Sequence, residues 1–154
     1  MHICITRFND KTLLENTRFR QINNIPCIYG CPVKITDTIL PNAELLVIEM
    51  NNSKNRIEGI GFIIKKAELD GRKKYKIYED NNYNRFTYKS TSYISKTSFT
   101  TVEQEHITNL ENLLFYTSRH CKRGHGIQLL PKHIINNKDF NYKKFIVSIY
   151  NNRL

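Results

Sequence analysis

Two apolar runs separated by a short polar turn, within residues 45–64, constrain the fold of this chain more than any other segment. Residues 45–50 (LLVIEM) and 56–64 (RIEGIGFII) are rich in β-branched and other apolar side chains, and residues 51–55 (NNSKN) have the composition of a turn. This pattern predicts a β-hairpin. The first run is almost continuously apolar, which predicts a strand buried on both faces at the centre of its sheet.

A helix is predicted over residues 101–115. Thr100 and Glu103 have the spacing of a capping box, in which each side chain bonds the backbone N–H of the other residue. Apolar side chains then recur at spacings of three and four on one face, with His106 on that side as a core or boundary residue. The residues of this face are Val102, His106, Ile107, Leu110, Leu113 and Leu114.

Weaker patterns predict the remaining elements. Aromatic and β-branched content predicts strands at residues 3–8, 75–79, 85–94 and 145–150. Residues 12–20 are predicted as a short helix or a turn that begins at Asp10 or Thr12. Strands and helices in this order predict a mixed-sheet α+β domain.

The chain has the length of one domain. Its 154 residues are 40% hydrophobic and include nine tyrosines and eight phenylalanines, enough to form a core. No repeat or Pro, Gly or Ser-rich linker divides it, so we expect a single domain over residues 1–154. No apolar stretch has the length of a membrane span, and residues 1–20 lack that of a secretory signal. We therefore expect a cytoplasmic or nuclear protein, with no membrane partner and no secretion.

The net charge of +10 is informative mainly through its position. Asn, Ile and Lys are abundant and Ala is nearly absent, which indicates an AT-rich genome such as that of a parasite, a low-GC bacterium or a large DNA virus. Residues 70–99 carry seven basic and three acidic side chains, and residues 116–144 carry seven and one. The positive charge is therefore concentrated in two blocks, as expected of a protein that contacts an anionic polymer.

The densest cluster of candidate binding residues is the segment 119–126 (RHCKRGHG). Its two glycines let backbone N–H groups turn outward toward an anion, while Arg119, Lys122 and Arg123 supply charge-assisted hydrogen bonds to phosphate oxygens. The alternative is a solvated basic loop between a helix and a strand. Contact with phosphate or nucleic acid is the preferred interpretation.

Tyrosines stand beside cations in the other basic block. This block holds Tyr75, Tyr78, Tyr83 and Tyr88 among Lys73, Lys74, Lys76, Arg85 and Lys89. In single-strand binding, aromatic faces stack on bases while cations hold the backbone. Tyrosine is also a good strand former, so most of these rings are expected to pack in the fold rather than to contact a ligand.

Four cysteines raise the question of a metal site. Cys27 and Cys31 are separated by three residues, and His120, Cys121 and His125 would complete a ligand set if the fold brought them close. A zinc ribbon normally has two paired knuckles, so reduced, partly buried thiols are favoured and no metal is predicted. No nucleophile-elbow, Walker or metalloprotease motif is present, so no catalytic residue or cofactor is predicted.

Three segments resemble the YTH and EVE branch of the PUA-like superfamily, small α+β barrels that bind RNA or modified DNA. Residues 45–62 are similar to the family's central hairpin, which has an N-x-S turn and a second strand beginning with G-x-G. Residues 28–31 (IYGC) stand where the family has a G-V-W-x segment whose Trp forms one wall of an aromatic cage. Residues 120–128 (HCKRGHGIQ) resemble the K-x-x-R-D-G-Q-E stretch that contacts the nucleic-acid backbone. The resemblance implies a mixed-sheet open barrel with flanking helices.

The resemblance also implies a site. The chain contains no Trp, so Tyr29 and Tyr83 take its place in a base-sized pocket, and reading of a modified base is a further hypothesis. We expect a non-catalytic domain that binds RNA or DNA, with Lys122 and Arg123 neutralising phosphates. The predicted binding residues are Tyr29, Lys73, Lys74, Tyr83, Arg85, Arg119, Lys122, Arg123 and His125.

Two other functions stay open at this point. Residues 123–130 (RGHGIQLL) resemble the acetyl-CoA loop of N-acetyltransferases, R/Q-x-x-G-x-G, although Pro131 would interrupt the helix that follows that loop. The third interpretation is a basic packaging or interaction protein of a virion or of chromatin, which would bind DNA and RNA without preference.

Overall fold

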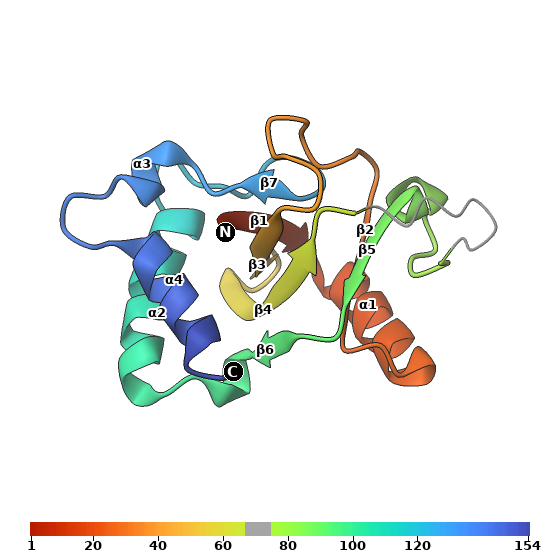
Figure 1. Ribbon diagram of the computed structural model, residues 1–154, viewed down its shortest axis with the longest axis horizontal. Helices are drawn as coiled ribbons and strands as arrows, with labels where there is room; N and C mark the ends of the chain where they lie inside the picture. Colours follow the sequence, from red (N-terminus) through yellow and green to blue (C-terminus); the bar gives the residue numbers. More distant parts are fainter. Residues whose placement is uncertain (67–74) are drawn as a thin grey trace.

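A five-stranded mixed sheet forms the centre of the molecule (Figure 1). The computed structural model describes residues 1–66 and 75–154. The sheet has the order β6-β4-β3-β1-β7, in which β1 and β3 are parallel and the other neighbours are antiparallel. Its strands are β1 (His2–Phe8), β3 (Glu44–Asn51), β4 (Arg56–Ile64), β6 (Tyr93–Ser95) and β7 (Gln128–Leu129).

The predicted hairpin is confirmed as β3 and β4, and β3 is the central strand. Residues Leu45 to Asn51 of β3 are all buried, as its continuous apolar run predicts. The Asn51 side chain closes the turn, because its Oδ1 accepts hydrogen bonds from the backbone N–H groups of Ser53 (3.0 Å) and Lys54 (3.1 Å). Because these hydrogen bonds join neighbouring residues, the turn can be predicted from the sequence.

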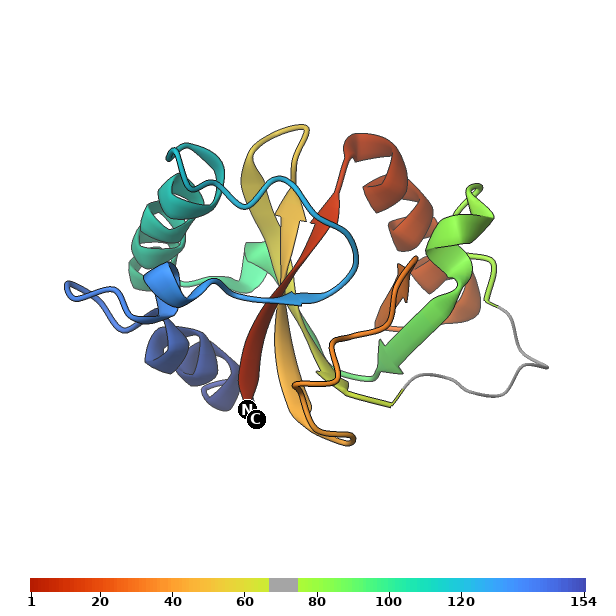
Figure 2. The same cartoon turned by 90° about the horizontal axis from the view of Figure 1, so that it is seen from above.

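One face of the sheet is covered by α1 (Asp10–Asn23) and by a separate two-stranded sheet, β2 (Cys27–Cys31) with β5 (Phe86–Ser90) (Figure 2). Helix α1 confirms the helix predicted from Asp10. Asn9 caps it, accepting a hydrogen bond from Thr12 N (2.8 Å), while the Thr12 hydroxyl accepts one from Asn9 N. Strand β2 was not predicted from the sequence.

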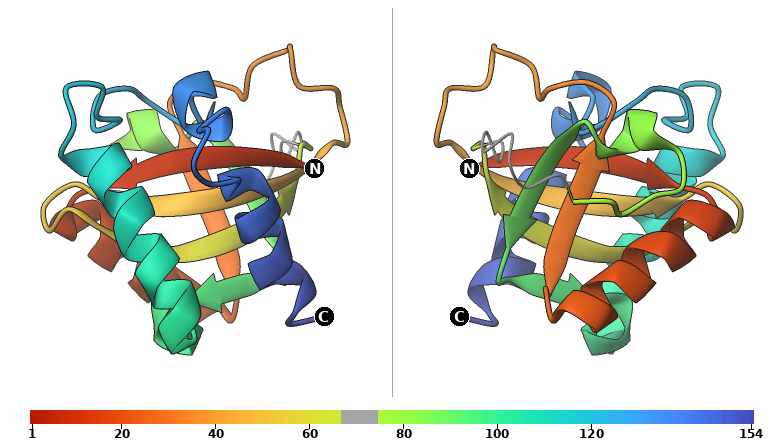
Figure 3. Two further views of the ribbon diagram at one scale, coloured as in Figure 1. Left: turned by 90° about the vertical axis from the view of Figure 1, so that its left-hand side faces the viewer. Right: turned by 90° about the vertical axis from the view of Figure 1, so that its right-hand side faces the viewer.

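The other face is covered by α2 (Thr101–Phe115), α3 (Lys132–Ile135) and α4 (Tyr142–Asn151) (Figure 3). Helix α2 has the predicted bounds, and the capping box between Thr100 and Glu103 is formed. Its Ile107, Leu110 and Leu114 are buried, whereas Val102 is 64% exposed and does not belong to the core. The sheet therefore separates two apolar cores.

The prediction of a strand at residues 145–150 is wrong, because this segment lies in α4. Tyr142, Ile146 and Ile149 are buried at spacings of four and three, the period of a helix, and they pack against the sheet. The β-branched content that suggested a strand serves instead to fill the space between this helix and the sheet. The Tyr150 ring stacks on Phe62 of β4, with 5.1 Å between the ring centroids.

The strands predicted at residues 75–79 and 85–94 are only partly correct. Residues 75–79 form no strand, because the backbone N–H groups of Ile77 and Tyr78 donate to Asn84 Oδ1 (3.0 and 2.9 Å) instead of to a neighbouring strand. The predicted strand at 85–94 is divided into β5 and β6, which belong to different sheets. The chain thus crosses from one sheet to the other at this point.

The predicted α+β class with a mixed sheet is confirmed. The described residues form a compact domain with four α-helices, and the strands do not close into a barrel, since they form a five-stranded and a two-stranded sheet. Among these residues no helix has the length and apolar character that a membrane crossing requires.

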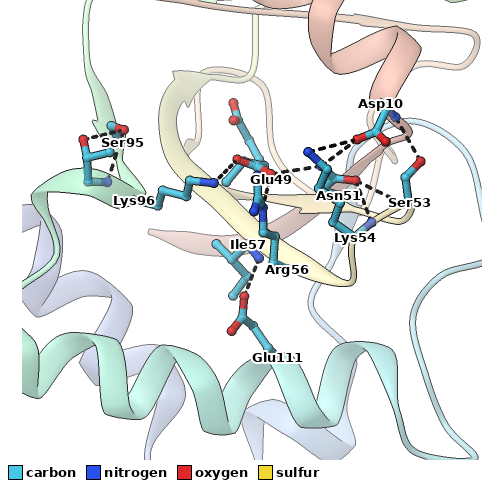
Figure 4. A network of polar contacts seen from close by, with 12 residues as sticks. Asp10, Glu49, Asn51, Ser53, Lys54, Arg56, Ile57, Ser95, Lys96 and Glu111 are labelled. Atoms are coloured by element: carbon cyan, nitrogen blue, oxygen red, sulfur yellow. Dashed lines mark hydrogen bonds and ion pairs between the residues drawn. The ribbon is translucent and has the colours of Figure 1, made fainter.

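A polar network joins the hairpin to both helical layers (Figure 4). Asn51 Nδ2 donates to Glu58 Oε1 (2.9 Å) and Asp10 Oδ1 (3.4 Å), and Glu111 Oε2 of α2 accepts from the backbone N–H of Ile57 (2.7 Å). The hairpin is thereby fixed to the first turn of α1 and to α2.

Glu58 in this network makes stability depend on pH. Burial alone would raise its pKa, but hydrogen bonds from Arg56, Lys96 and Asn51 outweigh burial and lower the pKa to about 2. Because the folded-state pKa lies below the ordinary value, the contribution of Glu58 is present above about pH 4.5 and is lost as the pH falls toward 2. We expect Glu58→Gln to flatten this part of a plot of unfolding free energy against pH, measured by urea denaturation. An unchanged slope between pH 4.5 and 2 would contradict this role.

Candidate functional site

A cavity of about 210 Å³, here called the loop cavity, opens where the chain between α2 and β7 passes the end of β1. Strands β1 and β3 are parallel, so their carboxyl ends meet at the same edge of the sheet, next to the first turn of α1. The cavity is lined by Thr6, Arg7, Phe8, Asn9, Thr12, Gly30, Pro32, Asn52, Tyr78, Tyr83, Lys122, Gly124, His125 and Gly126.

Two side chains, Arg7 of β1 and Asn52 of the hairpin turn, hold the basic loop in place. Arg7 Nε donates to the Cys121 carbonyl (2.6 Å) and Arg7 Nη1 donates to Gln128 Oε1 (2.8 Å). Asn52 Nδ2 donates to the Lys122 carbonyl (2.8 Å). Burial lowers the pKa of Arg7, but an arginine remains charged in a protein. Asn52 therefore holds the loop at Lys122, and Arg7 holds it at Cys121 before the two glycines and at Gln128 after them.

The two glycines of the loop have backbone conformations that other residues rarely adopt. Gly124 has φ 123° and Gly126 has φ 70°. A Cβ atom on Gly124 would also lie 2.7 Å from Gln128 Oε1, and one on Gly126 would lie 3.2 Å from Val33 Cγ2. The glycines therefore let the loop fold tightly against Arg7 and the residues after β2, which brings Lys122 and His125 to the cavity wall.

The aromatic wall of the cavity comes from Tyr78 and Tyr83. Their rings meet edge to face, with 6.3 Å between the centroids. Gly30 of β2 allows this, because a Cβ there would overlap the Tyr83 carbonyl and lie 3.0 Å from the Tyr78 ring. Tyr78 is almost fully buried and its hydroxyl accepts a hydrogen bond from Asn16 Nδ2 (3.1 Å), so Tyr83 is the more accessible of the two rings.

The structure places Tyr29 in the interior and not in the wall of the loop cavity. Its side chain is 1% exposed, and its hydroxyl donates to Glu49 Oε2 (2.7 Å). The Tyr93 hydroxyl donates to Glu49 Oε1 (2.9 Å), and burial raises the pKa of this carboxyl group. Tyr29 thus stabilises a buried acid between the two sheets and presents no surface to a ligand.

The other predicted binding residues occupy different places. Tyr83, Lys122 and His125 line the loop cavity, and Arg119 and Arg123 are exposed on the same loop without lining it. Arg85 is exposed and lines a separate cavity with Tyr75 and Phe86. Lys73 and Lys74 lie outside the described residues.

Among the lining residues that sequence reasoning did not single out are Arg7, Asn9, Thr12 and Asn52, which come from β1, the start of α1 and the hairpin turn. Asn9 and Thr12 have the spacing of a helix cap, which indicates a helix start but no binding role. Arg7 and Asn52 carry no local signal, because their partners Cys121 and Lys122 lie 114 and 70 positions away.

The loop cavity is electropositive. Its lining includes the cations Arg7 and Lys122 and the titratable His125, and none of the described lining residues is acidic. Asp10, at the start of α1, faces Lys54 at 3.9 Å and accepts a hydrogen bond from Asn51, so its charge is partly compensated. The cavity is therefore suited to an anionic ligand with an aromatic part.

The described residues show no cluster of metal ligands in this region. The four cysteines are free and buried, and burial raises the pKa of Cys4, Cys27 and Cys31 to about 12, so these thiols are protonated at neutral pH. No group of three metal-ligating side chains converges within residues 1–66 and 75–154. The glycine loop leads into β7 and not into a helix, so the helix N-terminus that binds pyrophosphate in N-acetyltransferases does not follow it.

Comparison of this chain with protein-family profiles, with curated protein sequences and with solved structures finds no match.

Proposed function

We propose that this protein is a non-catalytic nucleic-acid-binding domain whose loop cavity receives a base and whose basic loop contacts the adjoining phosphates. The observation that carries the proposal is the meeting of Lys122, His125 and the Tyr83 ring around one cavity that has no acidic residue among its described lining. Cations that bind phosphate and aromatic rings that stack on bases are the two parts that single-strand recognition requires.

The size of the cavity supports an aromatic ligand. An empty protein cavity of ~150 Å³ is known to hold a benzene ring. The loop cavity measures about 210 Å³ and is open to solvent, so one planar ring fits while its sugar and phosphate remain outside. The phosphate would then lie beside Lys122 and the exposed Arg123.

The PUA-like assignment and the reading of a modified base are finer parts of this proposal. Two glycine segments support the first. In the G-x-G segment of β4, a Cβ at Gly61 would overlap the Tyr29 side chain, and in the basic loop Gly124 and Gly126 have positive φ angles. In support of the second, Tyr83 is an accessible aromatic side chain at the cavity wall. A methylated base would gain apolar contact with this ring.

The test is a fluorescence-anisotropy titration of the protein against labelled twelve-nucleotide strands of RNA and DNA, single and double, with plain or methylated adenine. We expect single strands to bind, and the logarithm of the binding constant to fall linearly with the logarithm of the salt concentration. Acetyl-CoA should leave the melting temperature unchanged. Absence of binding to all strands at ~50 mM salt would overturn the proposal, and equal affinity for every strand would favour a packaging protein.

Removal of the Tyr83 ring tests the base-binding role separately. Stacking of one base on an aromatic side chain contributes about 1–3 kcal/mol, so Tyr83→Ala should weaken binding of a single strand about fivefold or more. Tyr83→Phe retains the ring and should bind within about twofold of the wild type. Tyr75→Ala is the matched control, because Tyr75 lines a different cavity. Equal losses in Tyr83→Ala and Tyr75→Ala would contradict the assignment of Tyr83.

A further inference from the structure

A second cavity, here called the α2 cavity, lies between α2 and the chain that joins α3 to α4, and it measures about 400 Å³. It is lined by His106, Asn109, Leu113, Asn137, Asp139, Phe140 and Tyr142. None of these residues lines the loop cavity. The left view of Figure 3 shows α2 and α4 side by side on this face of the sheet.

The α2 cavity has an aromatic platform. The His106 ring stacks on Phe140, with 4.3 Å between the centroids and 18° between the planes, and Tyr142 meets Phe140 edge to face. His106 is partly buried, and its ring also meets Phe145 edge to face at 5.1 Å, so only part of the ring is open to the cavity. A ring whose orientation is fixed by an aromatic neighbour loses less conformational freedom when a base stacks on it.

Polar groups for a base edge surround this platform. The side chain of Asn109 forms no hydrogen bond within the described part of the chain. Asn137 Oδ1 accepts hydrogen bonds from the backbone N–H groups of Asp139 (2.9 Å) and Phe140 (3.2 Å), which leaves its amide nitrogen as a donor. The Asp139 carboxylate can accept a hydrogen bond from an amino group of a base.

Cations are next to lining residues of the cavity in the sequence, with Lys138 between Asn137 and Asp139, and Lys143 and Lys144 after Tyr142. Lys132, Lys138, Lys143 and Lys144 are exposed, and none of them forms an ion pair with the residues that the structure describes. Asp139 is the one acidic residue between positions 116 and 144. Cations beside an aromatic platform are again the combination that holds a single strand.

The α2 cavity and the basic loop are connected through the C-terminal end of α2. Leu113 lines the cavity, and the Thr117 hydroxyl donates to the Leu113 carbonyl (3.2 Å) at the point where the loop begins. Tyr116 is 65% exposed and Arg119 is exposed at the start of the loop. The C-terminal end of α2 therefore leads from a lining residue of the α2 cavity into the basic loop.

We propose that the α2 cavity is a second nucleotide subsite, so that the protein binds a single strand of several nucleotides and not an isolated nucleotide. This inference rests on the proposed function. His106 stacks on the base, Asn109, Asn137 and Asp139 contact its edge, and Lys138, Lys143 and Lys144 neutralise the adjoining phosphates.

The test compares single strands of four and twelve nucleotides, each as RNA and as DNA of one sequence. The wild-type protein should bind the twelve-nucleotide strand at least tenfold more tightly. The triple variant Lys138→Glu/Lys143→Glu/Lys144→Glu should lose at least tenfold affinity for the long strand, with a salt slope smaller by about two for three lost phosphate contacts. It should bind the short strand like the wild type, because we expect four nucleotides to occupy the loop cavity and the basic loop without reaching the α2 cavity.

His106 provides a second measurement. His106→Ala should weaken binding of the long strand about fivefold, and His106→Phe, which keeps a ring, should restore it.

Equal affinity of the triple variant and the wild type for the long strand would overturn the second subsite. Failure of the proposed function is distinguishable, because in that case the wild-type protein binds neither strand. The control Arg18→Glu/Lys66→Glu changes two exposed cations that line neither cavity.

Discussion

Reversal of charge at Lys122 and Arg123 together is expected to weaken nucleic-acid binding at least tenfold at ~0.1 M salt. Both side chains belong to the basic loop, which Arg7 and Asn52 hold against the end of β1. Two lost phosphate contacts remove about 2 kcal/mol or more of binding free energy and lower the salt slope by nearly one unit per contact for a duplex, or about 0.7 for a single strand. Sequence preference should change little, because phosphate contacts carry no base information.

The matched control for Lys122→Glu/Arg123→Glu is Arg18→Glu/Lys66→Glu, which makes the same change in net charge on exposed residues outside the loop. If general attraction between a basic protein and a polyanion accounts for binding, the two double variants lose affinity equally. If the loop is the contact, only the first variant shows the tenfold loss. An unchanged affinity of the loop variant, with an unchanged melting temperature, would reject the assignment of Lys122 and Arg123.

Substitution of Gly61 by Ala is expected to lower the free energy of unfolding by about 3 kcal/mol, as for an overpacked core. A Cβ at this position would overlap the Tyr29 hydroxyl and lie 2.7 Å from Cys27 Sγ. Neither neighbour can move easily, because Tyr29 is held by its hydrogen bond to Glu49, and β4 is paired with β3 and β6 on its two sides. Urea denaturation at neutral pH measures the loss.

A second substitution identifies the cause of that loss. Tyr29→Phe alone removes a hydrogen bond to the buried Glu49 carboxyl group and should destabilise the protein by about 1–3 kcal/mol. In the Gly61→Ala background the same change removes the atom with the closest overlap, while Cys27 Sγ at 2.7 Å and the ring Cζ at 2.8 Å remain, so it should destabilise the protein less than in the wild type. Additive destabilisation in the double variant would contradict the packing argument. Gly59→Ala with Tyr93→Phe is a parallel pair, because a Cβ at Gly59 would overlap the Tyr93 hydroxyl.

Elements with a strong local signal were predicted correctly. The hairpin of β3 and β4 has turn bonds from Asn51 to its nearest neighbours, and α2 begins with a capping box between residues three positions apart. Such interactions depend on the sequence of a few neighbouring residues, so they are visible in it. The burial of β3 on both faces was predictable for the same reason, because continuous apolar character excludes a solvent-facing side.

Elements that depend on distant partners were predicted poorly. An apolar, β-branched run such as residues 145–150 fits either a strand or a buried helix, and only its packing against β4 decides between them. Strand β2 has no pattern of its own and exists through its pairing with β5, where Tyr29 lies opposite Tyr88. The side chains of Ile77 and Tyr78 belong to an apolar core although their backbone bonds Asn84.

The hairpin, the capped start of α2, the position of the cations in the 119–126 segment and the need for glycine at its bend follow from the residues of each segment. Which aromatic rings meet those cations depends on the packing of the whole chain. Successive side chains of a strand point to opposite faces, so Gly30 lines the loop cavity while its neighbour Tyr29 turns inward to Glu49. The cavity itself forms through Arg7 and Asn52, whose partners are 114 and 70 positions away, and contacts at such distances are fixed by packing of the whole chain and leave no local pattern.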